Sequence, residues 1–261
     1  MDIEIIGYAL ALLVGISLGL IGSGGSILTV PILVYILKIE PFLATAYSLF
    51  IVGSTALVGG VKNAWNRQVN FSMVLLFGIP SLVAVFVMRA YVLPLVPDTI
   101  TLGSLRLSKN LLLMVFFALV MFTSSMKMIR PKAITPSETT PKKSSLMLQG
   151  VLIGIVAGTV GAGGGFLIIP ALVLFAKASM KEAVGTSLFI VAIQSLFGFL
   201  GDASNPLIDW SLLLTFSAIA IVGIFIGIFL TRFIPDNNLK KGFGYFVLLM
   251  AIYIFTKEVF F

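Results

Sequence analysis

Eight long apolar runs follow one another along the chain, separated by short polar stretches. They cover residues 5–37, 42–61, 71–96, 111–129, 146–176, 183–200, 207–234 and 239–256. A helix needs about 20 apolar residues to cross a hydrocarbon layer of about 30 Å, and most of the runs have that length. Because lipid offers no hydrogen bonds to the backbone, such runs are expected to be helical. The pattern therefore predicts an all-α polytopic membrane protein.

The first and fifth runs are too long for one crossing, since a straight helix of thirty-odd residues reaches about 50 Å. A glycine-rich cluster interrupts each of them: Gly22-Ser23-Gly24-Gly25 in the first, and Gly161-Ala162-Gly163-Gly164-Gly165 in the fifth. We predict that each run enters the membrane, turns at its glycines and returns to the same side as a re-entrant hairpin.

The two halves of the chain repeat. A shift of 139 residues aligns 15–52 with 154–191, with 17 identities in 38 positions and no gap. Helix starts agree as well, since Glu40-Pro41 and the capping pair Ser179 and Glu182 fall at matching places. We predict a first membrane repeat over 1–130, a polar linker over 131–145 and a second repeat over 146–261. Each repeat has one hairpin and three transmembrane helices.

The distribution of Lys and Arg favours inverted repeats. If both glycine-broken runs return to the side they entered, 12 basic residues lie on the side of the linker and 5 on the other. If each run crosses once, the repeats are parallel and the counts are 8 and 9, without bias. Because cytoplasmic loops carry an excess of Lys and Arg, we expect inverted repeats with a cytoplasmic linker.

Composition narrows the chemistry. Apolar residues make up 59 % and charged residues 10 % of the 261 residues, and the chain has no Cys and no His. A cysteine or histidine metal site, a thiolate nucleophile and Ser-His catalysis are thereby excluded. The net charge of +7 is expected to orient loops rather than bind nucleic acid. No catalytic residue, metal or cofactor is expected, and the lipid bilayer is a partner.

The glycine clusters are the main candidate site. A break at membrane depth leaves backbone groups without helical partners, which is tolerated only inside protein or beside a wet cavity. Helices that resume near Ser26 and Gly165 would direct N-terminal N–H groups into that cavity, and such groups attract anions. The alternative is close helix packing, which we expect for Gly15, Gly19, Gly154 and Gly158.

Polar side chains inside the spans form a second signal. Ser48 and Thr55 share one helix face, and their aligned partners Ser187 and Gln194 do the same. We expect these faces to point inward, either toward a solute or toward hydrogen bonds between helices. Arg89 is expected to extend to the membrane interface, with a gating or anion-attracting role as the alternative. Asp202 is expected to be a solvated loop acid.

The candidate substrate-binding residues are Gly22, Ser23, Gly24, Gly25, Ser26, Ser48, Gly161, Ala162, Gly163, Gly164, Gly165, Ser187 and Gln194.

Taken together, the duplicated glycine motif, the proline six residues after it, the Ser-Leu-Phe stretch opening the next helix and the polar linker resemble the TauE/SafE sulfite exporter family. The motif positions are Gly22, Gly24, Gly25 and Pro31, with Gly161, Gly163, Gly164 and Pro170. The resemblance implies a bacterial or archaeal inner-membrane protein that moves small anions such as sulfite, organosulfonates or related carboxylates. Ser26, where the second half has Gly165, makes the two half-sites unequal.

These observations lead us to expect a secondary transporter of a small anionic solute working by alternating access. Its rivals are a transporter of a cation or neutral solute, a membrane-embedded hydrolase using Ser23, and a non-transporting scaffold. The sequence is also compatible with a homo-oligomer.

Overall fold

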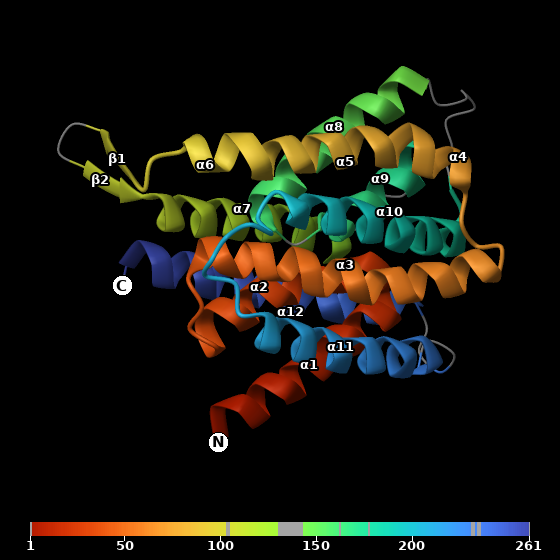
Figure 1. Cartoon of the computed structure of the whole chain (residues 1–261). Coiled ribbons are helices and arrows are strands. Elements are labelled where there is room, and N and C mark those ends of the chain that lie inside the picture. The colour runs from red at the N-terminus through yellow and green to blue at the C-terminus, as the bar shows by residue number, and fades with distance from the viewer. Residues whose placement is uncertain are drawn as a thin grey trace.

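The computed structural model describes residues 2–102, 105–129, 143–161, 163–176, 178–230, 233 and 236–260. Helices lie side by side along one long direction (Figure 1). In the first half they are α1 (Asp2–Ile21), the 3₁₀ helix η1 (Gly22–Leu28), α2 (Thr29–Pro31), the π-helix η2 (Ile32–Ile36), α3 (Pro41–Trp65), α4 (Phe71–Met73), η3 (Val74–Gly78), α5 (Ile79–Val87), η4 (Met88–Val92), α6 (Leu93–Leu95) and α7 (Lys109–Ile129). In the second half they are α8 (Lys143–Val160), α9 (Gly165–Phe175), α10 (Met180–Leu200), α11 (Trp210–Leu230) and α12 (Asp236–Phe260).

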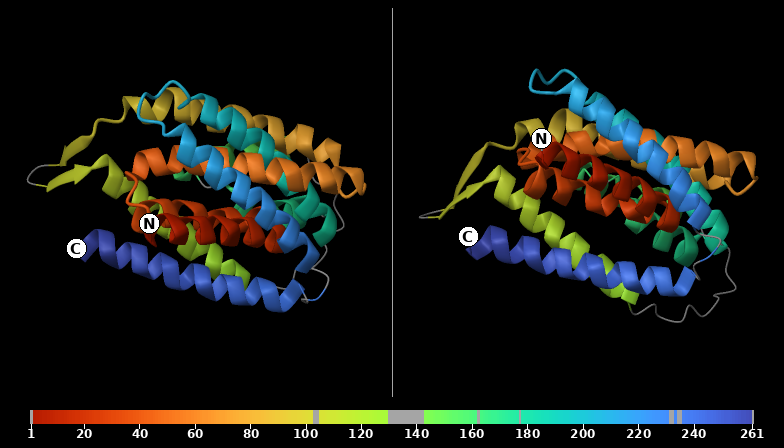
Figure 2. Two further views of the ribbon diagram at one scale, coloured as in Figure 1. Left: turned by 60° about the horizontal axis from the view of Figure 1, so that its bottom comes forward. Right: turned by 90° about the horizontal axis from the view of Figure 1, so that it is seen from below.

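Seven stretches of the described chain are long and apolar enough to cross a membrane. They are Ile6–Ile36, Pro41–Trp65, Phe71–Leu95, Lys109–Met126, Lys143–Val160, Glu182–Leu200 and Trp210–Leu230. The last apolar run is also helical, as α12, which packs along α7 (Figure 2). The predicted all-α polytopic architecture is confirmed. The linker predicted over 131–145 lies largely outside the described residues, and its last three positions already belong to α8.

The first glycine-broken run folds back on itself. Gly22 has φ +69°, a left-handed conformation that a residue with a Cβ rarely adopts. Beyond this turn, Gly25 lies against the backbone of α1, so that a Cβ on it would come within 2.4 Å of the Ser17 carbonyl carbon. Leu37 then packs beside Gly7, near the start of the chain. The stretch 6–36 is therefore a hairpin rather than one straight crossing.

The second run is broken by a sharper turn. Gly161, Gly163 and Gly164 all have positive φ, between 62° and 73°. A Cβ on Gly164 would lie 2.7 Å from the Cβ of Ala157, because α9 starts back along the end of α8. The helix resumes at Gly165, as predicted. In the first half the prediction is wrong: 3₁₀ turns begin at Gly22, so Ser26 lies inside a helix instead of starting one.

Each hairpin packs against a helix of the opposite half. On α1, Gly15 faces the backbone of Ala220 in α11; on α8, Gly154 faces the backbone of Ser81 in α5. Ser81 and Ala220 are themselves 139 residues apart, so the two contacts are equivalent under the internal repeat. A Cβ on Gly15 or Gly154 would lie within 2.4 Å of the facing carbonyl oxygen, so close packing explains these glycines as expected.

Two local expectations are confirmed and one element was missed. The long helix α3 starts at Pro41, and Ser179 caps α10 by accepting from the Glu182 amide. A two-stranded antiparallel hairpin, β1 (Thr99–Leu102) and β2 (Leu105–Ser108), precedes α7 and was not expected from the sequence. It projects at the end of the molecule that carries both chain termini (Figure 1).

Candidate functional site

The two glycine breaks touch each other in the buried interior. A Cβ on Gly165 would lie 2.2 Å from the carbonyl oxygen of Ser23, so the two backbones are in direct contact. The Ser23 hydroxyl lies 3.0 Å from the Gly165 carbonyl oxygen and donates to Ser187 Oγ at 2.7 Å. Ser187 in turn donates to the Val184 carbonyl, and Ser26 donates to the Ser23 carbonyl. These contacts join η1 of the first half to α9 and α10 of the second half.

A second set of polar contacts holds the turn between α8 and α9. The side-chain amide of Gln194 donates to the Gly163 carbonyl, and Ser81 donates to the amide oxygen of Gln194 at 2.5 Å. A Cβ on Gly163 would lie 2.7 Å from Ser195 Oγ, so this hydroxyl is directly beside the turn. The carbonyl oxygens of the second turn are thus partly occupied by side-chain donors, whereas helix α9 has no side-chain cap.

Several buried hydroxyls around the breaks have no hydrogen-bond partner among the described residues. They are Thr29 Oγ1, Ser48 Oγ, Thr55 Oγ1 and Ser195 Oγ, all on fully buried side chains. A buried hydroxyl without a partner costs roughly 1–3 kcal/mol, so a cluster of them is unusual for a purely structural interior. These groups supply unused hydrogen-bonding capacity near the point where the glycine turns meet.

Electrostatics at the breaks favour negative charge. Neither η1 nor α9 has an acidic residue in its first turn, and neither start is capped by a side chain. The first amides of a helix have no acceptor within the helix and lie at the positive end of its dipole. All residues of η1 are buried, as are Gly161 and Gly163–Gly165. In this conformation both turns are closed off from solvent.

A sequence model described as sulfite exporter TauE/SafE matches residues 7–254, nearly the whole chain. The chain belongs to the TauE/SafE sulfite exporter family. Relatives include a probable membrane transporter protein of Xylella fastidiosa (strain 9a5c), 31 % identical over 94 % of this chain and 92 % of that protein. A probable membrane transporter protein of Haemophilus influenzae is 28 % identical over 94 % and 95 %, and YdhB of Bacillus subtilis, with the same description, is 25 % identical over 88 % and 91 %. No solved structure matches the chain.

The protein is thus a multi-pass membrane transporter of the TauE/SafE family. Its structure brings most of the candidate residues of the sequence together: Ser23, Ser26, Gly165 and Ser187 form one contact set, and Gly163 with Gln194 forms the adjoining one. Gly22, Gly24, Gly25, Gly161 and Gly164 form the turns themselves. Ser48 is buried on α3 with its hydroxyl unpartnered, and Ala162 lies outside the described residues.

Two expectations about charged residues of this transporter are wrong. Arg89 does not extend to the membrane interface, because its side chain is 0 % exposed and pairs with Asp202 at 2.5 Å. Asp202 is correspondingly buried rather than solvated. The two residues of the pair are 113 positions apart in the chain. The sequence signal that could have found them is the opposite charge of the lone Arg in the third apolar run and the Asp that follows the sixth apolar run. Ser81 was also missed, because its aligned partner is the apolar Ala220.

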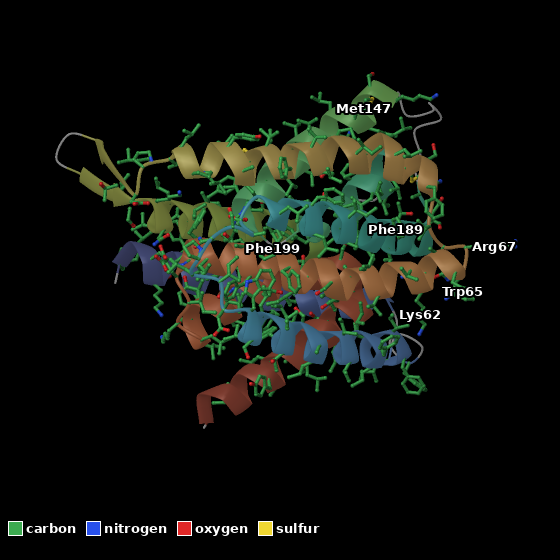
Figure 3. The ribbon with its side chains drawn as sticks, viewed as in Figure 1. Lys62, Trp65, Arg67, Met147, Phe189 and Phe199 are labelled. Carbon is green, nitrogen blue, oxygen red and sulfur yellow. The ribbon has the colours of Figure 1, made fainter. Side chains whose placement is uncertain are left out.

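A surface groove of about 510 Å³ lies away from the glycine turns. It runs between α3 and α11 and is lined by Leu57, Val58, Val61, Lys62, Trp65, Asn66 and Phe225. Lys62 and Trp65 lie at the end of the molecule opposite the chain termini (Figure 3). Trp65 is 87 % exposed, and exposed Trp side chains are typical of membrane interfaces. This groove is apolar and outward-facing, so it is not part of the candidate site.

Proposed function

We propose that this transporter moves small anions, such as sulfite, organosulfonates or related carboxylates, with the substrate bound where the two glycine turns meet. The observation that carries the proposal is the direct contact between Ser23 and Gly165, which brings two uncapped helix starts to one buried point. Uncapped N-terminal amides bind anions without a charged side chain. The family name, sulfite exporter, supports the same class of solute.

The mechanism that fits this site is alternating access. Both turns are buried in the observed conformation, so a solute reaches them only after part of the protein moves. The hairpins are the natural moving parts, since α1 and α8 cross helices of the opposite halves at glycines. Sites at the meeting point of broken helices are typical of secondary transporters.

We further propose that the halves are inverted in the cytoplasmic membrane of a bacterial or archaeal cell, with the linker inside. Support comes from α3 and α10, which are equivalent under the 139-residue repeat and run antiparallel: Gly53 lies against Leu196, and Gly60 against Phe189. The excess of basic residues on the linker side points to the same orientation.

An enzymatic role for Ser23 has little support. The groups in hydrogen-bond contact with its hydroxyl are the Ser187 hydroxyl and the Gly165 carbonyl, and neither can act as a general base. The chain has no His or Cys to take that role. We therefore propose carriage of an unmodified solute.

Counterflow in proteoliposomes tests the function. Vesicles loaded with unlabelled sulfite or ethanesulfonate should accumulate the labelled anion, whereas vesicles without protein should not. Substitution of Ser23→Asp places a negative charge at the meeting point, so anion counterflow should fall to background. If Ser23→Asp instead supports uptake of a cation, or if no sulfite, sulfonate or carboxylate exchanges in the wild type, the anion proposal is wrong.

A further inference from the structure

Outside the glycine turns, the described residues contain one cluster of buried charge, which we call the Arg89 cluster: Arg89, Asp202, Thr45, Phe42 and Lys109. Arg89 Nε donates to Asp202 Oδ2 at 2.5 Å, and Nη1 donates to Thr45 Oγ1 at 2.8 Å. The ring of Phe42 lies beside both cations, 5.0 Å from Arg89 Cζ and 4.4 Å from Lys109 Nζ.

The cluster adjoins the second glycine turn. A Cβ on Gly161 would lie within 2.5 Å of the Thr45 backbone, the same residue that accepts from Arg89. Gly158, one turn earlier in α8, lies against Met88, the neighbour of Arg89. The β1–β2 hairpin projects from one end of the molecule (Figure 1). Arg89 in η4 and Lys109 at the start of α7 flank this hairpin in the chain, so the cluster lies on that side of the turn.

Arg89 has hydrogen-bonding capacity that the protein leaves unused. Its Nη2 is buried and has no acceptor among the described residues, although the side chain is fully enclosed. A buried guanidinium carries five N–H donors and cannot lose its charge. Burying part of it without acceptors is costly, so an arrangement of this kind is expected where an additional anion binds.

The fold itself does not require the cluster. Under the 139-residue repeat, Arg89, Asp202 and Thr45 correspond to Ile228, Asn63 and Val184. In the matching place of the first turn, Gly22 packs against the apolar side chain of Val184. The described neighbours of Gly22 are thus apolar, and the Arg89–Asp202 pair has no counterpart among the residues aligned with it.

We propose that Arg89 is a second anion-binding residue beside the path to the second glycine turn, and that Asp202 competes with the transported anion for its guanidinium. This inference rests on the proposed anion transport. When the Asp202 carboxylate takes up a proton from the solvent at that end, it becomes neutral and releases Arg89, which then pairs with the anion. When the anion leaves, Asp202 loses the proton and pairs with Arg89 again, so one proton accompanies each anion bound.

The surroundings of Asp202 are consistent with proton uptake. Burial raises the pKa of the Asp202 carboxyl above its ordinary value, while the positive charges of Arg89 and Lys109 act in the opposite direction. Lys109 is itself held by a hydrogen bond to the Leu93 carbonyl, and the charges of Asp98 and Glu40 act on it from exposed positions. Asp202 is the buried acid of this cluster, so it is the group whose proton is linked to Arg89.

The inference is tested by measuring the binding of ethanesulfonate to the purified protein in steps from pH 5 to pH 8. A sulfonate keeps its negative charge over this range, so a change in affinity reports on the protein. Wild-type affinity should rise as the pH falls. At every pH, the Asp202→Asn variant should bind ethanesulfonate with the affinity that the wild type shows at low pH. Asp98→Asn, which removes an exposed acid near Lys109, is a control and should keep the pH dependence of the wild type. The double variant Arg89→Gln/Asp202→Asn should bind about tenfold or more weakly, as expected for loss of a hydrogen bond to a charged group.

Because both members of the pair become neutral together, the double variant leaves neither of them as an unpaired buried charge. It is therefore expected to fold, and its thermal transition checks this. Arg67→Gln, which removes an exposed arginine at the other end, is the matched control and should bind like the wild type. Wild-type affinity in Arg89→Gln/Asp202→Asn, or an unchanged pH dependence in Asp202→Asn, would overturn the inference and leave the proposed function intact. If the wild type itself neither binds nor exchanges any of the anions, both proposals fail.

Discussion

Gly165→Ala is the most direct perturbation of the contact between the two glycine turns. The added Cβ would lie 2.2 Å from the Ser23 carbonyl oxygen, 2.4 Å from its Cβ and 2.6 Å from its carbonyl carbon. An ordinary contact needs about 1 Å more, and the obstructing atoms are mostly backbone, so the two hairpins must move apart. Overpacking of this kind costs about 1–3 kcal/mol.

The expected loss of stability can be measured by thermal unfolding in detergent. For a chain of this size, 1 kcal/mol corresponds to about 2–4 °C, so Gly165→Ala should lower Tm by about 2–12 °C. Counterflow of ethanesulfonate should fall much further, because the separated turns no longer present their amides to one point. Gly242→Ala is the matched control: a Cβ there meets nothing within 4 Å, so Tm and counterflow should be unchanged or slightly improved. Wild-type Tm and counterflow in Gly165→Ala would refute the contact between the turns.

Three further predictions concern packing and buried polar groups. Arg89→Gln leaves the buried Asp202 without its partner and should destabilise the protein by about 3–5 kcal/mol, more than Arg89→Gln/Asp202→Asn does, as read from Tm; equal Tm values would contradict a buried pair. Tyr35→Phe removes a 2.8 Å hydrogen bond to Glu258 that ties the return arm of the first hairpin to α12, so it should cost about 1 kcal/mol, and Glu258→Gln should add little to it in a double-mutant cycle. Gly19→Leu should separate α1 from α11, because even a Cβ at this position would lie 2.4 Å from the Ile224 carbonyl oxygen. A Gly19→Leu variant that is protease-resistant and fully active would rule out this helix crossing.

Local and repeated features of the fold could be predicted from the sequence. The helix start at Pro41 and the Ser179 cap depend on neighbouring residues only, and both were correct. The hairpin shape of the two long runs followed from their length and their glycines, because no straight helix of that length fits the hydrocarbon layer. The inward position of Ser48 and Gln194 followed from the helix faces that they share with Thr55 and Ser187, respectively, and all four side chains are fully buried.

Features that depend on distant partners could not be predicted in the same way. Arg89 and Asp202 each resemble an ordinary residue at the end of a span, and only the fold reveals that they meet. The 3₁₀ conformation of η1 depends on its packing against α1, where Gly25 touches the Ser17 backbone, so the sequence alone suggested a later start near Ser26. Direct contact between Ser23 and Gly165 likewise requires both halves to be placed.

The central claim is that an anion binds between the two glycine turns, and anomalous diffraction can locate such an anion. The chain has no Cys that 2-bromoethanesulfonate could alkylate, so this compound can serve as a reversible ligand carrying an anomalous scatterer. The account predicts a bromine peak in the interior beside Ser23 and Gly165, with the sulfonate toward the amides of η1 and α9. A bromine peak found only elsewhere, for instance in the surface groove beside Lys62, would contradict it.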